Sequence, residues 1–389
     1  MNNDTPAKGP KKQNILLRLL TLAVTAALVL GALTLVVYRD RFNLDALKRW
    51  MAFRALETSD TGEVAPFTHA GGDKLAVAYL NGGVLLSSSS GVHYYSLSGE
   101  TYAEQVLAMK NPVLSASTKA GVVYDAGGGS LFLFQGAQQT MHLSPEEGGA
   151  LLSARVNDSG WLTVTAQQSG YKGAVTVYDG SGERVIQISL SSTFVVDAVL
   201  SPDCKTVAVV TMDQDRGAFE SKVSFYPVDS KQPRLTASLG NSTVLDLDYE
   251  DDTLWVLGET QLTMVAQDDG SLHSYPFERN FLKGCTFGAD GFALLLLGRY
   301  RAGAATQALT VSGDGTVLGS VPLSGQVLSY AGAGGYASLL TGGGLTIYTS
   351  DLQPYSHLES TQGARYTDLS ANGSALLANA QQAWLYIPK

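Results

Sequence analysis

Cysteine, histidine and charge are all scarce in this chain of 389 residues. Two cysteines cannot build a disulfide scaffold or a cysteine-based zinc site, and the five histidines show neither an HxH nor an HExxH spacing. The absence of a Gly-Lys dipeptide excludes a phosphate-binding P-loop, and no GxSxG or GxGxxG motif is present. Only 16% of the residues are charged and 45% are hydrophobic, which is typical of a folded protein. We therefore expect no enzymatic activity, no cofactor and no metal site.

The net charge of −9 is unevenly distributed along the chain. The first 57 residues carry nine Lys and Arg residues and four acidic ones, whereas the remainder carries 17 basic and 31 acidic side chains. An acidic body repels phosphate backbones, so nucleic acid is not an expected partner. The basic N-terminal part needs a separate explanation.

Residues 19–38 form a run without any charged side chain. At about 1.5 Å per residue in a helix, this run covers about 30 Å, the thickness of a bilayer's hydrocarbon core. The alternative is a cleaved signal peptide, but its apolar region has only about 7–15 residues and precedes a small-residue cleavage site, which Val37, Tyr38 and Arg39 do not provide. The run therefore predicts one transmembrane helix in contact with the lipid bilayer.

Lys and Arg residues flank both ends of this run, so their count does not decide the orientation. The body is rich in Tyr, Ser and Gly and poor in Lys, which is typical of exported proteins. We expect residues 1–18 to be a basic cytoplasmic tail and the body to lie outside the cell membrane.

The linker over residues 39–61 contains a short amphipathic pattern at residues 43–56. Asn43 is a candidate N-cap, and Leu44, Leu47, Trp50 and Met51 fall on one stripe at helical spacing. Such a helix lies on anionic headgroups or packs under the globular body, and the pattern favours neither alternative.

A repeat of short apolar strands separated by tight turns begins after residue 61. The equivalent turn positions lie 39 to 48 residues apart, at Gly82, Gly121, Gly160, Cys204, Asp252, Gly291, Gly334 and Gly373. Two further strands follow in each copy, and four antiparallel strands in about 40–45 residues are the signature of a propeller blade. Residues 62–389 are therefore predicted to be an all-β domain, a β-propeller of eight four-stranded blades. Seven blades is the alternative, if one weak repeat merges with its neighbour.

The last copy contains only three strands, whereas a ring must pair every edge. The extended segment over residues 64–69 precedes the first complete blade and is expected to supply the missing strand. Cys204 occupies a turn position, so we predict a structural role for it and no bridge to Cys285.

The third position of each inner strand forms a column that should line the central channel. It is occupied by Val77, Ser115, Ser153, Asp197, Asp246, Gly284, Ser329 and Asp368. Hydroxyls and carboxylates in a ring could hold a cation, but a wet channel without a metal is the preferred interpretation.

Three of the connections between second and third strands are predicted to be long loops, at residues 167–173, 213–222 and 298–307. They carry basic and aromatic side chains on an acidic body: Tyr171, Lys172, Arg216, Phe219, Arg299, Tyr300 and Arg301. Extended loops on a rigid scaffold often carry recognition, so these residues are the predicted binding site. The alternative is that the loops are tolerated insertions without a role.

Several short motifs resemble one family. These are KRW-x-x-x-R-x-L at residues 48–56, NPVL at residues 111–114 and VYD-x-GG at residues 123–128. They are similar to a bacterial family catalogued as domain of unknown function 5711. The resemblance implies a single-pass anchor and an outer propeller, and it implies no known activity.

Two functions remain open at this point. The first is a non-catalytic module for protein interaction or envelope assembly, tethered to the membrane, with a protein partner at the membrane surface. The second is an exported propeller enzyme of the quinoprotein, lactonase or glycosidase type, although the four Trp residues hold no common position in the repeats. A sensor that signals through its cytoplasmic tail is less favoured because residues 1–18 contain no domain.

The anchor should remain in the mature protein. N-terminal sequencing of the protein extracted from membranes should give the first residues of the chain, because the run over residues 19–38 lacks a cleavage site. A sequence that begins after Tyr38 would instead identify the run as a signal peptide.

Overall fold

The computed structural model describes residues 20–26, 29–30, 44–144, 149–215 and 217–389, and the chain divides into two compact units, Met1–Met51 and Ala52–Lys389. In the first unit, residues 20–26 and 29–30 are helical, but most of the predicted transmembrane helix and all of the basic tail lie outside the described residues. Within the described part of the chain, no helix is both long enough and apolar enough to cross a membrane.

A helix, α2 (Leu44–Phe53), forms where the amphipathic pattern predicts one. Its candidate N-cap, Asn43, lies outside the described residues. The side chains of Leu47, Trp50 and Met51 are exposed. Phe53, at the end of the helix, is buried against Val64 and Leu385.

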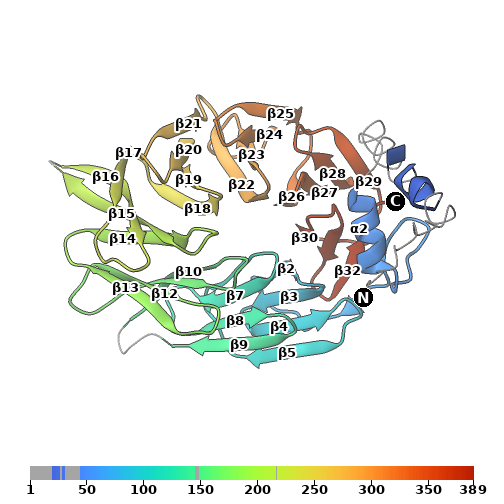
Figure 1. The fold of residues 1–389 in the computed structure, drawn as a ribbon, viewed down its shortest axis with the longest axis horizontal. Helices are drawn as coiled ribbons and strands as arrows, with labels where there is room; N and C mark the ends of the chain where they lie inside the picture. Colours follow the sequence, from blue (N-terminus) through green and yellow to red (C-terminus); the bar gives the residue numbers. More distant parts are fainter. Residues whose placement is uncertain (1–19, 27–28, 31–43, 145–148, 216) are drawn as a thin grey trace, which may run out of the picture. The chain divides into compact units, whose positions relative to one another are not determined.

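The second unit is a β-propeller of eight four-stranded sheets, which confirms the prediction of eight blades over the alternative of seven (Figure 1). The first strands of the blades form the inside of the ring, where most of them contact the first strand of the next blade (Figure 1). These inner strands are β2 (Ala76–Leu80), β6 (Pro112–Ala116), β10 (Leu151–Val156), β14 (Phe194–Leu200), β18 (Val244–Glu250), β22 (Phe281–Ala289), β26 (Val327–Ala333) and β30 (Tyr366–Leu369). We number the blades 1 to 8 in this order.

Each inner strand pairs antiparallel with the next strand of its blade. The second strands are β3 (Gly83–Ser88), β7 (Ala120–Asp125), β11 (Leu162–Ala166), β15 (Thr206–Asp215), β19 (Thr253–Gly258), β23 (Phe292–Gly298), β27 (Tyr336–Thr341) and β31 (Ala375–Ala378). The third strands are β4 (Gly91–Ser96), β8 (Leu131–Gln135), β12 (Gly173–Tyr178), β16 (Ala218–Pro227), β20 (Gln261–Ala266), β24 (Gln307–Ser312), β28 (Gly344–Thr349) and β32 (Gln382–Tyr386).

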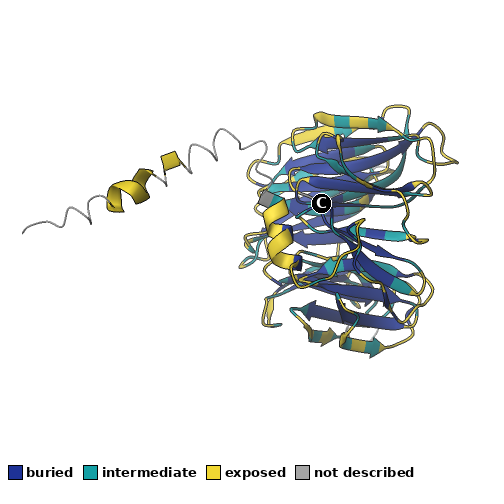
Figure 2. Ribbon diagram, turned by 90° about the vertical axis from the view of Figure 1, so that its right-hand side faces the viewer, coloured by how far each residue is buried: buried dark blue, intermediate teal, exposed yellow. Residues whose placement is uncertain are grey.

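The fourth strands form the outer edge and are partly exposed (Figure 2). They are β5 (Thr101–Val106), β9 (Gln138–Leu143), β13 (Arg184–Leu190), β17 (Leu235–Gly240), β21 (Leu272–Pro276), β25 (Val317–Pro322), β29 (Pro354–Leu358) and, in blade 8, β1 (Phe67–Thr68).

The hydrophobic core of the propeller is divided among the interfaces between blades. Eight clusters of buried apolar side chains each join two adjacent blades, and together they go once around the ring. Phe225 of blade 4 and Leu247 of blade 5, for example, belong to one such cluster. The second and third strands therefore read as continuous apolar runs, because both of their faces are covered.

Blade 8 is closed by the N-terminal segment, as the count of strands predicts. Strand β1 pairs antiparallel with β32 in the register Phe67↔Ala383 and Thr68↔Gln382. Backbone hydrogen bonds extend the pairing beyond the strand, from Val64 N to Leu385 O (2.9 Å) and from His69 N to Gln381 O (2.9 Å). The Phe67 ring packs 5.5 Å from that of Tyr95 in blade 1, so this segment also covers the interface between blades 8 and 1.

Replacing Phe67 with alanine should destabilise the closed ring. Phe67→Ala removes a buried ring from the cluster between blades 8 and 1, which should lower the free energy of unfolding by about 3 kcal/mol. The neighbouring Thr68 is exposed, so Thr68→Ala is the matched control and should change it by less than about 0.5 kcal/mol. Urea unfolding of the full chain measures both, and equal midpoints for the two variants would contradict closure by this segment.

Candidate functional site

The predicted channel column lies on the inner strands of all eight blades, one residue to each strand. In five consecutive blades the pairing register shifts just before the column residue. The column residues that follow such a bulge are Ser153, Asp197, Asp246, Gly284 and Ser329. A bulge adds one unpaired residue and changes the direction of the side chains beside it. Blades 3 to 7 therefore present their column residues differently from blades 8, 1 and 2.

One arginine, which was not among the site residues predicted from the sequence, connects three of these blades. Arg155, on β10 of blade 3, donates from Nε (3.1 Å) and Nη2 (2.5 Å) to Asp197 Oδ2 of blade 4. It also donates from Nη2 to Asp246 Oδ1 (2.7 Å) and from Nη1 to Leu247 O (2.6 Å), both in blade 5. Burial alone would lower the pKa of Arg155, but the two carboxylates raise it above its ordinary value, so the guanidinium stays charged.

Two further carboxylates face the inside of the ring. Burial raises the pKa of Asp248, on β18, and of Asp368, on β30, to about 6 in each case. Oδ2 of Asp368 accepts a hydrogen bond from Tyr79 N (2.7 Å), which joins blade 8 to blade 1. Burial also raises the pKa of the Cys285 thiol, which opposes formation of a nucleophilic thiolate. The two cysteines are free, in agreement with the prediction.

The ion network lines a cavity of about 310 Å³ at the start of the inner strands of blades 2 to 5. Apolar residues also line it, among them Val113, Leu152, Val196 and Leu245. The beginnings of the inner strands and the connections between second and third strands lie at the same side of a propeller. The cavity therefore opens toward the side that carries the predicted binding residues, and we call this side the loop rim.

The loop rim carries the exposed aromatic side chains of the sequence prediction. Tyr171, Phe219 and Tyr300 are exposed on blades 3, 4 and 6, whereas Arg216 lies outside the described residues. Lys172 donates to Ser192 O (2.8 Å) and lies 4.6 Å from the centre of the Phe194 ring.

In blade 6, Arg301 pairs with Glu259 of blade 5 (3.1 Å), and Arg299 beside it is exposed. Apart from Arg216, the predicted residues thus share one rim, but they are distributed over blades 3, 4 and 6 and do not form a single cluster.

The predicted loop over residues 213–222 is wrong. Strands β15 and β16 continue through it and pair from Met212↔Ser221 to Asp215↔Ala218, so it is a two-stranded hairpin that projects from blade 4 (Figure 1). Antiparallel pairing satisfies the backbone groups of this segment better than an irregular loop does. The loops at residues 167–172 and 299–306 are present as expected.

Two aromatic residues of the loop rim were missed because they begin inner strands. Phe194 and Phe281 are exposed at the first positions of β14 and β22. Arg155 was missed because it lies two residues beyond the column, a position that faces the same side of the strand. The residues two positions beyond the column form a second column on the inner strands. In β10 this position is held by Arg155, the one charged residue of the strand.

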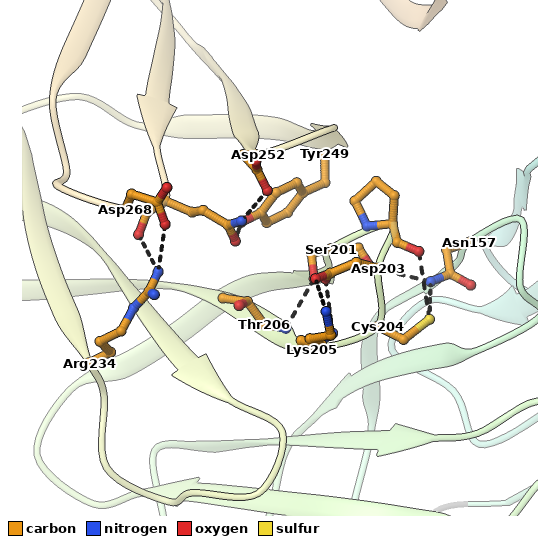
Figure 3. Close-up of polar contacts among 12 residues, drawn as sticks. Asn157, Ser201, Asp203, Cys204, Lys205, Thr206, Arg234, Tyr249, Asp252 and Asp268 are labelled. Carbon is orange, nitrogen blue, oxygen red and sulfur yellow. Dashed lines mark hydrogen bonds and ion pairs between the residues drawn. The ribbon is translucent and has the colours of Figure 1, made fainter.

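The opposite side of the propeller is held together by polar contacts between turns (Figure 3). Cys204 occupies its predicted turn position with φ of 60°, and Asn157 of blade 3 donates from Nδ2 to its Sγ (3.2 Å). Arg234 of blade 4 donates to Gln267 O of blade 5 (2.7 Å), and the side chain of Gln267 accepts a hydrogen bond from the Tyr249 hydroxyl (2.5 Å). These contacts give this side a structural role.

Over the described residues, no group of three His, Cys, Asp or Glu side chains could hold a metal ion. The acidic stretch at residues 246–252 forms strand β18 and a hairpin turn at Asp251.

Replacing Asp368 with asparagine should change how stability depends on pH. The pKa of Asp368 is raised in the folded state, so the folded protein binds a proton more tightly than the unfolded chain does. The resulting stability is present below about pH 4 and is lost as the pH rises through about 6. Asp368→Asn, which retains an acceptor for Tyr79 N–H, should therefore gain on the order of 2 kcal/mol relative to the parent between pH 4 and pH 7.

The control is Asp351→Asn in an exposed turn. The Thr349 hydroxyl lowers the pKa of Asp351, so its contribution has the opposite sign and is lost as the pH falls. Denaturant unfolding at several pH values measures both variants, and identical pH profiles for Asp368→Asn and the parent would contradict the assignment.

Solved structures share the fold at low sequence identity. The C-terminal WD40 domain of Sif2 has a TM-score of 0.58 at 12% identity, covering 83% of this chain and 99% of that one. The computationally designed Ika8 protein has a TM-score of 0.57 at 13% identity, covering 82% and 98%. BamB from Moraxella catarrhalis has a TM-score of 0.50 at 12% identity, covering 84% and 99%. At these identities the likeness shows the β-propeller fold alone.

No curated protein matches the sequence. A family model does match, over residues 63–283, and its description is a family of unknown function, DUF5711. Because the match covers more than half of the chain, this protein belongs to the DUF5711 family.

Proposed function

We propose that this protein is a non-catalytic protein-interaction module that binds its partner through the loop rim. One observation carries the proposal. Of the seven exposed aromatic side chains among the described residues, five lie on the loop rim: Tyr171, Phe194, Phe219, Phe281 and Tyr300. Exposed aromatic residues gathered on one side of a rigid scaffold are typical of interaction surfaces.

The charged residues of the loop rim support the same function. Arg299 and Arg301 flank Tyr300, and Arg and Tyr are the residue types that contribute most to interface energies once water is excluded. Tyr300 is 74% exposed and Phe219 is 57% exposed, so both retain a large apolar area for a partner to cover.

The channel residues favour binding over catalysis. Asp197 accepts two hydrogen bonds from Arg155, which makes it an ion-pair partner and leaves it poorly suited to transfer a proton. The Cys285 thiol is buried with a raised pKa. An exported enzyme remains the alternative function, but no observation favours it.

We further propose that the module is tethered to the cell membrane with its N-terminus in the cytoplasm and the propeller outside. The apolar run over residues 19–38 supports the membrane anchor, and the Tyr-, Ser- and Gly-rich, Lys-poor body supports its export. Trp50 and Met51 on α2 provide exposed apolar area of the kind that contacts headgroups.

The double variant Arg299→Ala, Tyr300→Ala should bind the partner less well without unfolding. The partner is captured in intact cells by a photo-crosslinking amino acid placed at Phe219, on the same rim in blade 4. In the double variant the crosslinked adduct should decrease about tenfold or more, because two exposed contact residues of the rim are lost. The melting temperature should not change, since both residues are exposed.

Tyr102→Ala is the matched control, since Tyr102 is an exposed aromatic residue on outer strand β5. It should leave the adduct unchanged. Equal capture by the double variant and the parent would show that the loop rim is not the binding surface. Loss of the propeller when protease is added to intact cells tests the proposed orientation in the same samples.

A further inference from the structure

The cavity at the channel mouth is lined both by apolar side chains and by the ion network. Leu152, Val196 and Leu245 line it where the inner strands bulge, and Arg155, Asp197 and Asp246 form the ion network inside. A volume of about 310 Å³ is sufficient for one side chain or a small molecule. The proposed function uses the surrounding rim and assigns no role to this cavity.

The charges around the cavity do not cancel. Arg155 is the one cationic group in the network, and it is paired with two carboxylates, Asp197 and Asp246. Asp248 on the same strand as Asp246 adds a further acidic group on the inside of the ring. A cavity with an excess of negative charge and apolar walls favours a cation over an anion.

One carboxylate in the network is accessible to a ligand. The Asp246 side chain is 42% exposed, whereas that of Asp197 is 12% exposed. Among the described residues, the hydrogen bonds to Asp246 come from Arg155 and from Leu247 N, and both end on Oδ1. Oδ2 of Asp246 is therefore the acceptor that a ligand can reach. The Ser153 hydroxyl lines the same cavity and offers a second acceptor.

We propose that the channel mouth binds a primary alkylammonium group, supplied by a lysine side chain of the partner protein. The four methylene groups of lysine match the apolar lining at Leu152, Val196 and Leu245, and the ammonium group matches Asp246 Oδ2 in the same cavity. The wide rim of exposed aromatic residues around the cavity favours a side chain of a protein over a free amine. The choice of a partner protein's lysine over a free amine rests on the proposed function. The recognition of the ammonium group itself depends on the cavity alone.

The probe is N-acetyl-L-lysine N-methylamide, titrated into the full chain in detergent and followed by ligand-observed NMR. Saturable binding is expected for this compound and not for N-acetyl-L-norleucine N-methylamide, which has a similar aliphatic chain but no charge. Asp246→Asn should weaken the binding about tenfold or more, because a charge-assisted hydrogen bond is lost. Asp368→Asn is the matched control, since it removes a channel carboxylate from blade 8 and should leave the affinity unchanged.

Leu245→Lys provides a second variant in case Asp246→Asn fails to fold. Leu245 is exposed, so the substitution should be tolerated, and the new ammonium group should occupy the cavity and abolish binding of the probe. Equal binding of the lysine and norleucine compounds, or unchanged binding in both variants, would overturn the proposal. If 1,5-diaminopentane binds much more tightly than the lysine compound, the alkylammonium group does not come from a partner's lysine, and a free diamine is the ligand. The two proposals can also fail separately. If the probe binds normally but the double variant Arg299→Ala, Tyr300→Ala is crosslinked to the partner as efficiently as the parent, only the proposed function is contradicted.

Discussion

The fold depends on one constraint, which is that each blade buries its apolar faces only against its two neighbours. Eight clusters of core residues, one in each interface, replace a single central core. A break anywhere in the ring would expose two apolar faces at once. The pairing of β1 with β32 prevents this, since it completes blade 8 and places Phe67 against blade 1. The short N-terminal segment therefore stabilises all the blades indirectly.

The same ring leaves its centre without an apolar core, and the inner strands fill that space in a different way. Bulges in blades 3 to 7 turn side chains at the mouth, and Arg155 joins blades 3, 4 and 5 through carboxylates that would otherwise repel one another. The two sides of the propeller also differ. Polar contacts such as Arg234 to Gln267 connect turns on one side, whereas the loop rim keeps its aromatic residues exposed.

The architecture could be predicted from the sequence because it repeats. Strand–turn–strand copies at a nearly constant spacing predict the blades, and one missing strand in the last copy predicts the closure by residues 64–69; the structure confirms both. The channel mouth could not be predicted in the same way. A bulge changes the register by one residue and leaves no mark in the apolar pattern, and Arg155 meets Asp197 and Asp246 only because three blades converge. The hairpin at residues 213–222 was missed because its polar residues and Gly217 resemble those of a loop and no strand alternation marks it.

Closure by the N-terminal segment also determines the order in which the protein can be completed during its synthesis. Strand β1 is among the first parts of the domain to leave the ribosome, and its partner β32 is among the last. Until residues 382–386 emerge, blade 1 lacks the neighbour that covers Phe67 and Tyr95, so an apolar face and an open edge stay accessible to other chains. Contacts between such distant parts of a sequence form slowly. The growing chain therefore exposes this apolar face until its last blade has been made.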